Sequence, residues 1–430
     1  MVVIRRLYTA ALSVGLLASA PFYAARAFRR GTGLALAERL GHWSDETVAA
    51  VRGRRPVWVH AVSVGEVLAA EPLLREIKRR YPTLCLLLTT VTATGRRTVI
   101  ERVPQADAVA YFPLDLPRVA ERVLRQANPR LFLCVETEIW PNVLFALATR
   151  NVPSFLVNAR LTVRSAGRYA RARRLFGPAL GGMSGFAAQT RADAERFIDI
   201  GADPSRVVVT GNLKFDQGLE DPATIEPSRR ADLGLGPDEQ LWVAGSTHPA
   251  DETALLQAYG RLADPRLVLL LAPRHLDRLA HVEAAVREHG CEPIRRSTLR
   301  AGRVNGGPGR RVIILDALGE LASLYTEAAV AFVGGTLARV GGHNLLEPAA
   351  RAKPVLFGPH THKCEEIARA LLEADAGVRV HSADDLCDQV RRLLGDEPLR
   401  KAMGERGRDV VARNRGAVDR TLAMLQPWLG

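Results

Sequence analysis

Short apolar runs alternate with segments of helical periodicity along most of the chain. From Val57 onward, each apolar run is followed by a turn signal and, in most cases, by an amphipathic segment. Runs that are apolar on both faces are typical of strands buried in a parallel sheet. The first series of predicted strands comprises Val57–Val62, Thr83–Thr90, Ala108–Phe112, Leu131–Val135, Ser154–Asn158, Gly185–Gln189 and Arg206–Thr210.

A second series of predicted strands comprises Leu241–Ala244, Leu267–Ala272, Val312–Leu315, Val330–Val333 and Lys353–Phe357. Between the two series, Asp216–Gln240 is rich in Pro, Asp and Gly and lacks a periodic core pattern, so we place an interdomain linker there. The pattern predicts an α/β fold with two Rossmann-like domains that face a cleft. We set the domains at residues 31–217 and 218–430.

Residues 1–30 have a different character. Leu7–Ala27 is an apolar stretch without charge before Arg26, and its length is close to the ~20 residues that cross a bilayer as a helix. Ala18–Ala20 resembles a signal-peptidase site, but the apolar core before it is short and Pro21 would follow the cut. The pattern favours an uncleaved membrane-anchor helix. The larger arginine cluster follows it, which predicts that the rest of the chain lies in the cytoplasm.

Composition excludes a disordered or fibrous protein, since 47% of 430 residues are hydrophobic. The chain has 59 Lys and Arg against 46 Asp and Glu, a net charge of +13. This excess indicates an acidic partner such as an anionic membrane, a phosphorylated lipid or nucleic acid, although an arginine-rich genome would also produce it. Five cysteines without a CxxC pair indicate a reducing compartment.

Ligands of parallel sheets bind at the carboxyl ends of strands, so the residues that follow each run are the candidates for chemistry. Glu66 follows Val57–Val62 and opens a helix, where free amides favour an ionised carboxylate that could act as a base. A capping residue of the first turn is the plainer interpretation. Glu136 and Glu138 follow Leu131–Val135, and period-two geometry places them on one side of the chain. They could orient a cation or simply cap the next helix.

Two cations also follow predicted strands. Lys214 comes after the last strand of the first series, and Arg274 comes after Leu267–Ala272. We expect both to meet at a sheet edge facing the cleft, where they could neutralise a phosphate leaving group. Each residue alone is weak evidence, because exposed basic residues are common.

The densest segment holds Gly334-Gly335 and then Gly341-Gly342 before Asn344 and Glu347. Glycines after a strand let amides approach a phosphate, and a helix that starts near Asn344 would direct its N-terminus at the same group, with Glu347 placed for ribose hydroxyls. A structural turn is the alternative. The nucleotide fingerprints GxGxxG and GxxxxGK[ST] are absent. His360, His362 and Cys364 lack the spacing of a metal site, and no DxD triplet occurs, so we expect no metal.

Taken together, five strings resemble the motif series of the Kdo (3-deoxy-D-manno-octulosonic acid) transferases of lipopolysaccharide biosynthesis. They occur in that family's order and cover essentially the whole chain. The strings are Ser63-Val64-Gly65-Glu66, Glu136-Thr137-Glu138-Ile139-Trp140-Pro141-Asn142, Leu213-Lys214-Phe215-Asp216, Pro273-Arg274-His275 and Gly341-Gly342-His343-Asn344-Leu345-Leu346-Glu347.

The resemblance implies a glycosyltransferase that moves Kdo from CMP-Kdo to the lipid A precursor lipid IV A at the cytoplasmic face of the inner membrane, releasing CMP. It implies a GT-B-like fold with an acceptor-binding first domain and a CMP-sugar-binding second domain, no cofactor and no nucleic-acid partner. It assigns Glu66 as the general base of an inverting displacement, with Glu136 and Lys214 stabilising the transition state. The CMP-contacting residues that it implies are Pro273, Arg274, Leu318, Gly319, Glu320, Asn344, Leu345, Leu346 and Glu347.

Two other functions fit the same residues less fully. One is a different GT-B glycosyltransferase that uses a UDP-sugar and a lipid acceptor, and the other is a non-catalytic membrane protein that binds anionic lipid. Nucleotide preference separates the first from a Kdo transferase, because CMP should then protect the protein thermally where UDP does not. The absence of any nucleotide effect would favour the second.

Overall fold

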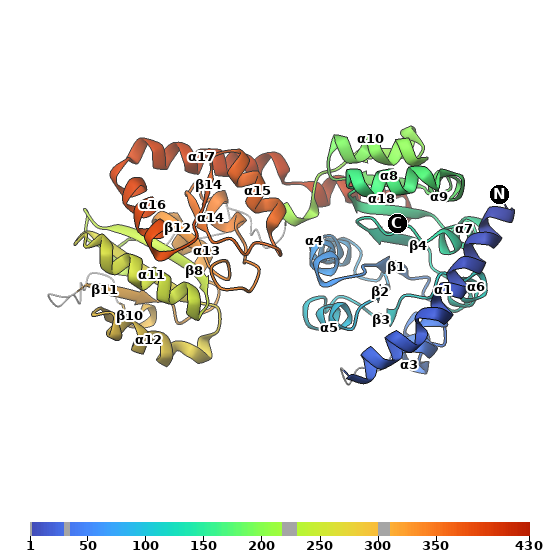
Figure 1. Cartoon of the computed structure of the whole chain (residues 1–430), viewed down its shortest axis with the longest axis horizontal. Helices are drawn as coiled ribbons and strands as arrows, with labels where there is room; N and C mark the ends of the chain where they lie inside the picture. Colours follow the sequence, from blue (N-terminus) through green and yellow to red (C-terminus); the bar gives the residue numbers. More distant parts are fainter. Residues whose placement is uncertain (1, 30–34, 217–229, 300–309) are drawn as a thin grey trace. The chain divides into compact units, whose positions relative to one another are not determined.

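The computed structural model describes residues 2–29, 35–216, 230–299 and 310–430. The chain forms two compact units (Figure 1), of which the first comprises Met1–Gln217 together with Arg415–Gly430 and the second comprises Gly218–Asn414. Residues 217–229 of the predicted linker lie outside the described residues. The prediction for residues 415–430 was wrong, because this segment joins the first unit and not the second.

The first unit is built on seven parallel strands in the order β3-β2-β1-β4-β5-β6-β7. The strands are β1 (Val57–His60), β2 (Leu86–Thr90), β3 (Ala108–Tyr111), β4 (Leu131–Val135), β5 (Ser154–Ala159), β6 (Gly185–Ala188) and β7 (Val207–Val209). The helices and short 3-10 turns are α1 (Val2–Arg29), α2 (Leu36–Arg39), α3 (Asp45–Val51), α4 (Val64–Arg80), α5 (Ala93–Arg102), α6 (Pro117–Ala127), α7 (Pro141–Thr149), α8 (Val163–Arg171), α9 (Arg173–Gly181), α10 (Arg191–Ile200), η1 (Pro204–Arg206), η2 (Leu213–Asp216) and α18 (Ala417–Leu429).

The core of this unit lies on both faces of the sheet, because side chains alternate along each buried strand. Trp58 packs with Phe132 and Phe112 on one face, whereas Val57 and Val59 pack on the other. The second face also receives α18, through apolar side chains that include Leu422, Leu425 and Leu429. Burial of this apolar face is the physical reason that the C-terminal helix belongs to the first unit.

The second unit is also a seven-stranded parallel sheet, in the order β10-β11-β9-β8-β12-β13-β14. The strands are β8 (Gln240–Thr247), β9 (Leu267–Pro273), β10 (Glu292–Arg295), β11 (Arg311–Ile314), β12 (Ala328–Val333), β13 (Val355–Phe357) and β14 (Gly377–Arg379). The helices and 3-10 turns are η3 (Arg230–Leu233), α11 (Pro249–Leu262), η4 (Leu276–Arg278), α12 (Leu279–Glu288), η5 (Arg296–Thr298), α13 (Leu321–Leu324), η6 (Tyr325–Glu327), α14 (Leu346–Ala350), α15 (Glu365–Glu373), α16 (Ala383–Gly395) and α17 (Glu397–Asn414).

Two strands of the second sheet, β10 and β14, were absent from the sequence prediction. They are the two edges of the sheet. β10 has the sequence Glu-Pro-Ile-Arg with only Ile294 buried, and β14 has only three residues. An edge strand is covered on one side only, so it does not need the continuous apolar run by which buried strands are recognised.

The predicted N-terminal helix is present as α1 and continues to Arg29. Within the described ranges, no helix combines the length and the apolar character that crossing a membrane requires. α1 contacts α7 and α9 of the first unit.

A buried carboxylate holds the glycine-rich segment of the second unit in place. Asp251, fully buried on α11, accepts hydrogen bonds from the amides of His248 and Gly335 through Oδ2 at 3.0 and 2.7 Å. Its Oδ1 accepts those of Leu337 and Ala338 at 3.0 and 2.9 Å. The turn after β12 is therefore fixed to the start of α11 by a single side chain.

We predict that Asp251→Asn will destabilise the second unit, since an amide group cannot accept at both of its terminal atoms. The loss should be about 1.5–3 kcal/mol, as for a hydrogen bond to a charged group. Denaturant unfolding of the full chain measures it. The exposed Asp238 of the same unit provides a matched control, Asp238→Asn. Equal stability of the two variants would remove Asp251 from this role.

Candidate active site

In each sheet the strand order reverses beside the first strand of that unit. In the first unit the reversal lies between β1 and β4, and in the second it lies between β8 and β12. Ligands of open parallel sheets bind outside the carboxyl ends of the strands at such points. Glu66 and Glu136 follow β1 and β4, and His248 and Gly335 follow β8 and β12. The candidate residues thus flank both reversal points.

Glu66 lies in the first turn of α4 and is 9% exposed. Its Oε2 accepts a hydrogen bond from the amide of Val62 at 2.7 Å, and its Oε1 accepts one from the hydroxyl of Ser63 at 3.1 Å. Glu66 therefore does perform the capping-like role that we considered the plainer interpretation. Capping and catalysis do not exclude each other here, because a carboxylate fixed by two donors still has lone pairs for a proton.

Burial raises the pKa of Glu66 from 4.5 to about 7, against the opposing effect of the Val62 amide. The charges of Glu138 and Glu136 raise it further. The expectation that the helix N-terminus favours the ionised form was therefore wrong in its net direction. Desolvation outweighs the hydrogen bonds, because it penalises the charged form throughout a poorly hydrated site.

Glu136 is paired with Lys214, whose Nζ lies 3.1 Å from its Oε1. Both side chains are about one-fifth exposed, at 20% and 19%. The period-two argument for Glu136 and Glu138 does not apply, because β4 ends at Val135 and Glu136 adopts a left-handed φ of 62°. The two carboxylates nonetheless interact. The pKa of Glu138 is raised first by burial and then by the negative charge of Glu136.

The segment that carries Lys214 is held from both ends. The amide of Leu213 donates to Oδ1 of the buried Asn158 at 2.9 Å. Asp216 accepts from the amides of Gly416 and Val418 at 2.8 Å each and so caps α18. Sequence reasoning missed the positioning role of Asp216, because its partners lie about two hundred residues along the chain and no local signal marks the pair.

In the second unit, Arg274 follows β9, and its amide donates to the carbonyl of Thr247 at 3.0 Å. Its side chain is exposed, and among the described residues its guanidinium has no hydrogen-bond partner. The pKa of His343 is lowered to about 4, first by burial and then by the positive charge of Arg274. The rings of His343 and His248 are stacked, with Nε2 atoms 2.9 Å apart. Lys214 belongs to the other unit, so its meeting with Arg274 stays a prediction.

The glycine-rich segment places backbone close to backbone. A Cβ on Gly334 would lie 2.4 Å from the carbonyl oxygen of Ser246, and one on Gly341 would lie 2.4 Å from Nε2 of His362. Gly341 also has a φ of 105°, which other residues rarely adopt. Cys364 would meet a Cβ on Gly342 in the same way. His362 and Cys364 thus pack against glycines, and the described residues contain no group of three or more potential ligands placed to hold a metal.

α14 begins at Leu346, two residues after the predicted start at Asn344. Asn344 accepts from the amide of Leu346 at 3.0 Å and donates to Oε1 of Glu347 at 3.1 Å. Leu345 and Leu346 are fully buried. Neither the side chains nor the backbone of these two residues, which the resemblance places among the CMP contacts, are exposed on the surface of this structure.

The remaining predicted CMP contacts lie at the ends of other strands of the same sheet. Pro273 is the last residue of β9 and is buried. Leu318 is 82% exposed, and Gly319 has a φ of 91° in the loop that precedes α13. Glu320 is 3.3 Å from Nε of Arg296. An exposed leucine beside a glycine turn leaves the backbone of this loop open to a ligand.

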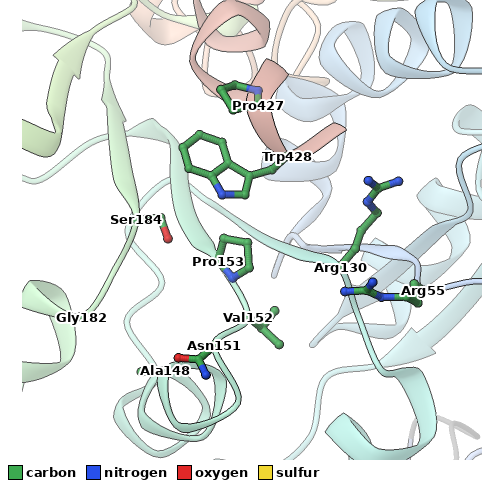
Figure 2. A pocket seen from close by; sticks show the side chains of 10 residues that line it. All are labelled: Arg55, Arg130, Ala148, Asn151, Val152, Pro153, Gly182, Ser184, Pro427 and Trp428. Carbon is green, nitrogen blue, oxygen red and sulfur yellow. The ribbon is translucent and has the colours of Figure 1, made fainter. Parts of the chain in front are cut away.

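The first unit also has an open cavity of about 580 Å³, which Figure 2 shows between Trp428 and the two arginines Arg55 and Arg130. Arg55, Arg130 and Pro153 precede β1, β4 and β5 respectively. The cavity therefore lies at the amino edge of the sheet, opposite Glu66. We do not place the active site in it.

The sequence is similar to a known protein family along most of its length. A family model described as 3-deoxy-D-manno-octulosonic-acid transferase (kdotransferase) matches residues 35–217. The 3-deoxy-D-manno-octulosonic acid transferase of Haemophilus influenzae is 36% identical over 397 residues, which cover 92% of this chain and 91% of the relative. The transferase of the same name from Bordetella pertussis is 38% identical over 390 residues, covering 87% and 88%.

Solved structures support the fold. The UDP-GlcNAc 2-epimerase from Neisseria meningitidis bound to UDP-GlcNAc superposes with a TM-score of 0.50 at 13% identity and covers 86% of this chain and 100% of the epimerase. At that identity the likeness concerns the fold alone, which consists of two parallel-sheet α/β domains of the GT-B-like kind. The identity to the curated transferases extends over both units, and the chain therefore belongs to the Kdo transferase family of glycosyltransferases.

Proposed function

We propose that this protein transfers Kdo from CMP-Kdo to a hydroxyl of lipid IV A and releases CMP. The acceptor oxygen attacks the anomeric carbon of Kdo, the bond from that carbon to the phosphate oxygen breaks, and CMP leaves with the electron pair. The acceptor proton passes to Glu66. Attack from the face opposite the leaving group inverts the anomeric configuration.

The observation that carries the proposal is the pKa of about 7 at Glu66, on the reversal point of the first sheet. A base works best when its pKa lies near the operating pH, because it is then deprotonated yet still accepts a proton readily. The two donors Val62 and Ser63 hold the carboxylate in one orientation. A carboxylate held in one orientation is suited to accepting the proton of the acceptor hydroxyl.

The pair formed by Glu136 and Lys214 supports a second role, the stabilisation of negative charge. The ammonium group of Lys214 is a multiple hydrogen-bond donor, and it donates to Glu136. The carboxylate fixes the ammonium in place, so that little reorganisation is needed when charge develops on the departing phosphate. We assign Lys214 to that charge and Glu136 to holding Lys214.

For the donor, we assign the CMP moiety to the second unit, at the reversal point between β8 and β12. Arg274 offers an exposed guanidinium for the phosphate. Asn344 and Glu347 offer polar groups for the ribose. This assignment includes Pro273 and the Leu318–Glu320 loop as backbone contacts.

We further propose that the protein acts at the cytoplasmic face of the inner membrane, where α1 attaches it. The five cysteines are free and buried, as suits a reducing compartment. A net charge of +13 suits both an acceptor that carries phosphate groups and an anionic membrane surface.

Glu66→Gln should fold normally and lose about 10²–10⁴-fold in turnover with CMP-Kdo and lipid IV A, because the amide cannot accept the proton. Mass spectrometry of the lipid product measures the rate. In the wild type, kcat/KM should rise with pH through a midpoint near 7, the pKa of the buried carboxyl. A variant that keeps more than about a third of wild-type turnover would exclude Glu66 as the base.

The carboxyl of Glu66 should also make stability depend on pH, but stability should fall as the pH rises, whereas kcat/KM should increase. Its pKa is raised from 4.5 to about 7, so between these values the folded state keeps a proton that the unfolded state releases. The contribution of Glu66 to the free energy of unfolding is therefore present below pH 4.5 and is lost as the pH rises through 7. Denaturant unfolding at pH 5 and pH 8 should show a smaller decrease for Glu66→Gln than for the wild type. Identical decreases would contradict the raised pKa.

Arg274→Ala should weaken CMP binding by about 1.5–3 kcal/mol, the usual loss for a hydrogen bond to a charged group. Glu347→Ala should weaken it by a similar amount. Arg287→Ala, which removes an exposed arginine from α12 of the same unit, serves as the control. Calorimetry measures the affinities, and UDP should bind more weakly than CMP. Unchanged CMP affinity in both variants would place the nucleotide elsewhere, and a preference for UDP would favour a UDP-sugar transferase.

A further inference from the structure

One face of α1 is attached to the folded body of the first unit by polar side chains. The hydroxyl of Tyr8 donates to Oδ2 of Asp115 at 2.8 Å, and Nε of Arg5 donates to Oδ1 of Asn142 at 2.9 Å. The amide of Asn142 in turn donates to the hydroxyl of Thr9 at 3.1 Å. Asp115 and Asn142 are themselves buried, at 2% and 0% exposure. The helix therefore occupies a formed polar site on the body.

The opposite face of α1 is open to solvent and mainly apolar, with the exposed Arg6 at its margin. Val3, Leu7, Val14 and Leu17 are between 66% and 76% exposed. Positions separated by 4, 11 and 14 residues fall on one side of a helix, because each turn takes ~3.6 residues. We call this set the apolar stripe. Helices of soluble proteins turn their apolar side inward, so the arrangement of α1 is the reverse of the usual one.

The neighbouring helices α8 and α9 supply positive charge, and α9 contacts α1 (Figure 1). No Asp or Glu occurs between Glu138 and Asp193. Five arginines on these two helices are exposed, and within the described part of the chain none of them pairs with an acidic side chain. These residues, the arginine group, are Arg164, Arg168, Arg171, Arg173 and Arg174. An apolar stripe beside unpaired arginines is complementary to an anionic bilayer surface.

The contacts of α1 are incompatible with a helix that crosses the bilayer. Arg5, Tyr8 and Thr9 contact the body, and partial burial along α1 continues as far as Ser19. The remainder of the helix ends at Arg29, a length of only ~15 Å at ~1.5 Å per residue. The hydrocarbon core is ~30 Å thick. While α1 stays bound to Asp115 and Asn142, it is too short to span.

We propose that α1 lies in the plane of an anionic bilayer, with the apolar stripe in the acyl boundary and the arginine group on the lipid headgroups. The proposal rests on the membrane attachment proposed above and specifies its geometry.

Label depth tests the orientation in the full chain. Single cysteines at Val3, Val14 and Leu17 carry a fluorophore, and the native cysteines do not interfere because all five are buried. Vesicles of phosphatidylglycerol and phosphatidylcholine contain quenchers at known depths. The three labels should lie at one shallow depth, ~5–10 Å into the boundary. A spanning helix would separate Val3 from Leu17 by ~20 Å in depth, which would overturn the proposal. Labels that stay in water would overturn it as well.

Vesicle flotation tests the two contributions separately. Leu7→Glu should reduce binding to the anionic vesicles at least tenfold, whereas Ile100→Glu should leave it unchanged, although Ile100 of α5 is equally exposed at 65%. Arg168→Glu combined with Arg171→Glu should reduce binding at low salt and remove its salt dependence. Full binding by the Leu7 and arginine variants would contradict the proposal. If Leu7→Glu instead dissociates a dimer measured by light scattering, the stripe binds a second copy and the proposal fails.

Activity on detergent-dispersed acceptor separates this proposal from the function. A wild-type protein that transfers Kdo in detergent but does not bind vesicles would overturn the bilayer geometry and leave the catalytic assignment standing. A protein that binds vesicles at uniform shallow depth but transfers no Kdo would overturn the catalytic assignment and leave the bilayer geometry standing.

Discussion

Parallel pairing of every strand in both sheets is the constraint on which the candidate site depends. Because all strands of a sheet point the same way, the residues that follow them gather at one edge, however far apart they lie in sequence. Glu136 and Lys214 are brought together at such an edge, although almost 80 residues separate them, and Arg274 and His343 are brought together in the other unit. The opposite edge of the first sheet has an open cavity, lined by residues that precede the strands and by Pro427 and Trp428 of α18. The direction of the strands thus decides which residues can act together.

The buried carboxylates of the two units show how the number of donors decides what a carboxylate does. Asp251 accepts four amide hydrogen bonds and holds the glycine-rich turn to α11. Glu66 accepts two hydrogen bonds, and desolvation then outweighs them and raises its pKa to about 7. A fully satisfied carboxylate is a structural anchor, whereas an incompletely compensated one is ready to exchange a proton. Both are acidic residues in the first turn of a helix after a strand, so the local sequence does not separate the two roles.

The sequence alone determined the interior of the fold, because a strand covered on both faces must be apolar along its whole length. Every interior strand of the two sheets coincides with a predicted apolar run. The turn after β12 was equally visible, since a glycine is required where backbone approaches backbone, as at Gly334. The order of the motifs indicated the Kdo transferase family, which the identity to curated relatives bears out. All of these signals are local, and each reflects a requirement that a few adjacent residues meet by themselves.

Tertiary structure decided what depends on distant partners. The edge strands β10 and β14 exist because neighbouring strands offer them hydrogen bonds, and their own residues carry no apolar run. The last helix returns to the first unit because its leucines complete a core formed by the other end of the chain, and Asp216 caps it there. The charge state of Glu66 follows from burial, which no local pattern reports. The apolar N-terminal stretch predicted a membrane helix. Only the tertiary contacts of α1, such as that of Tyr8 with Asp115, showed which face of the helix is covered by the body and which is exposed. Burial and electrostatics are sums over the whole fold, and for that reason the sequence could name the candidate residues without fixing their states.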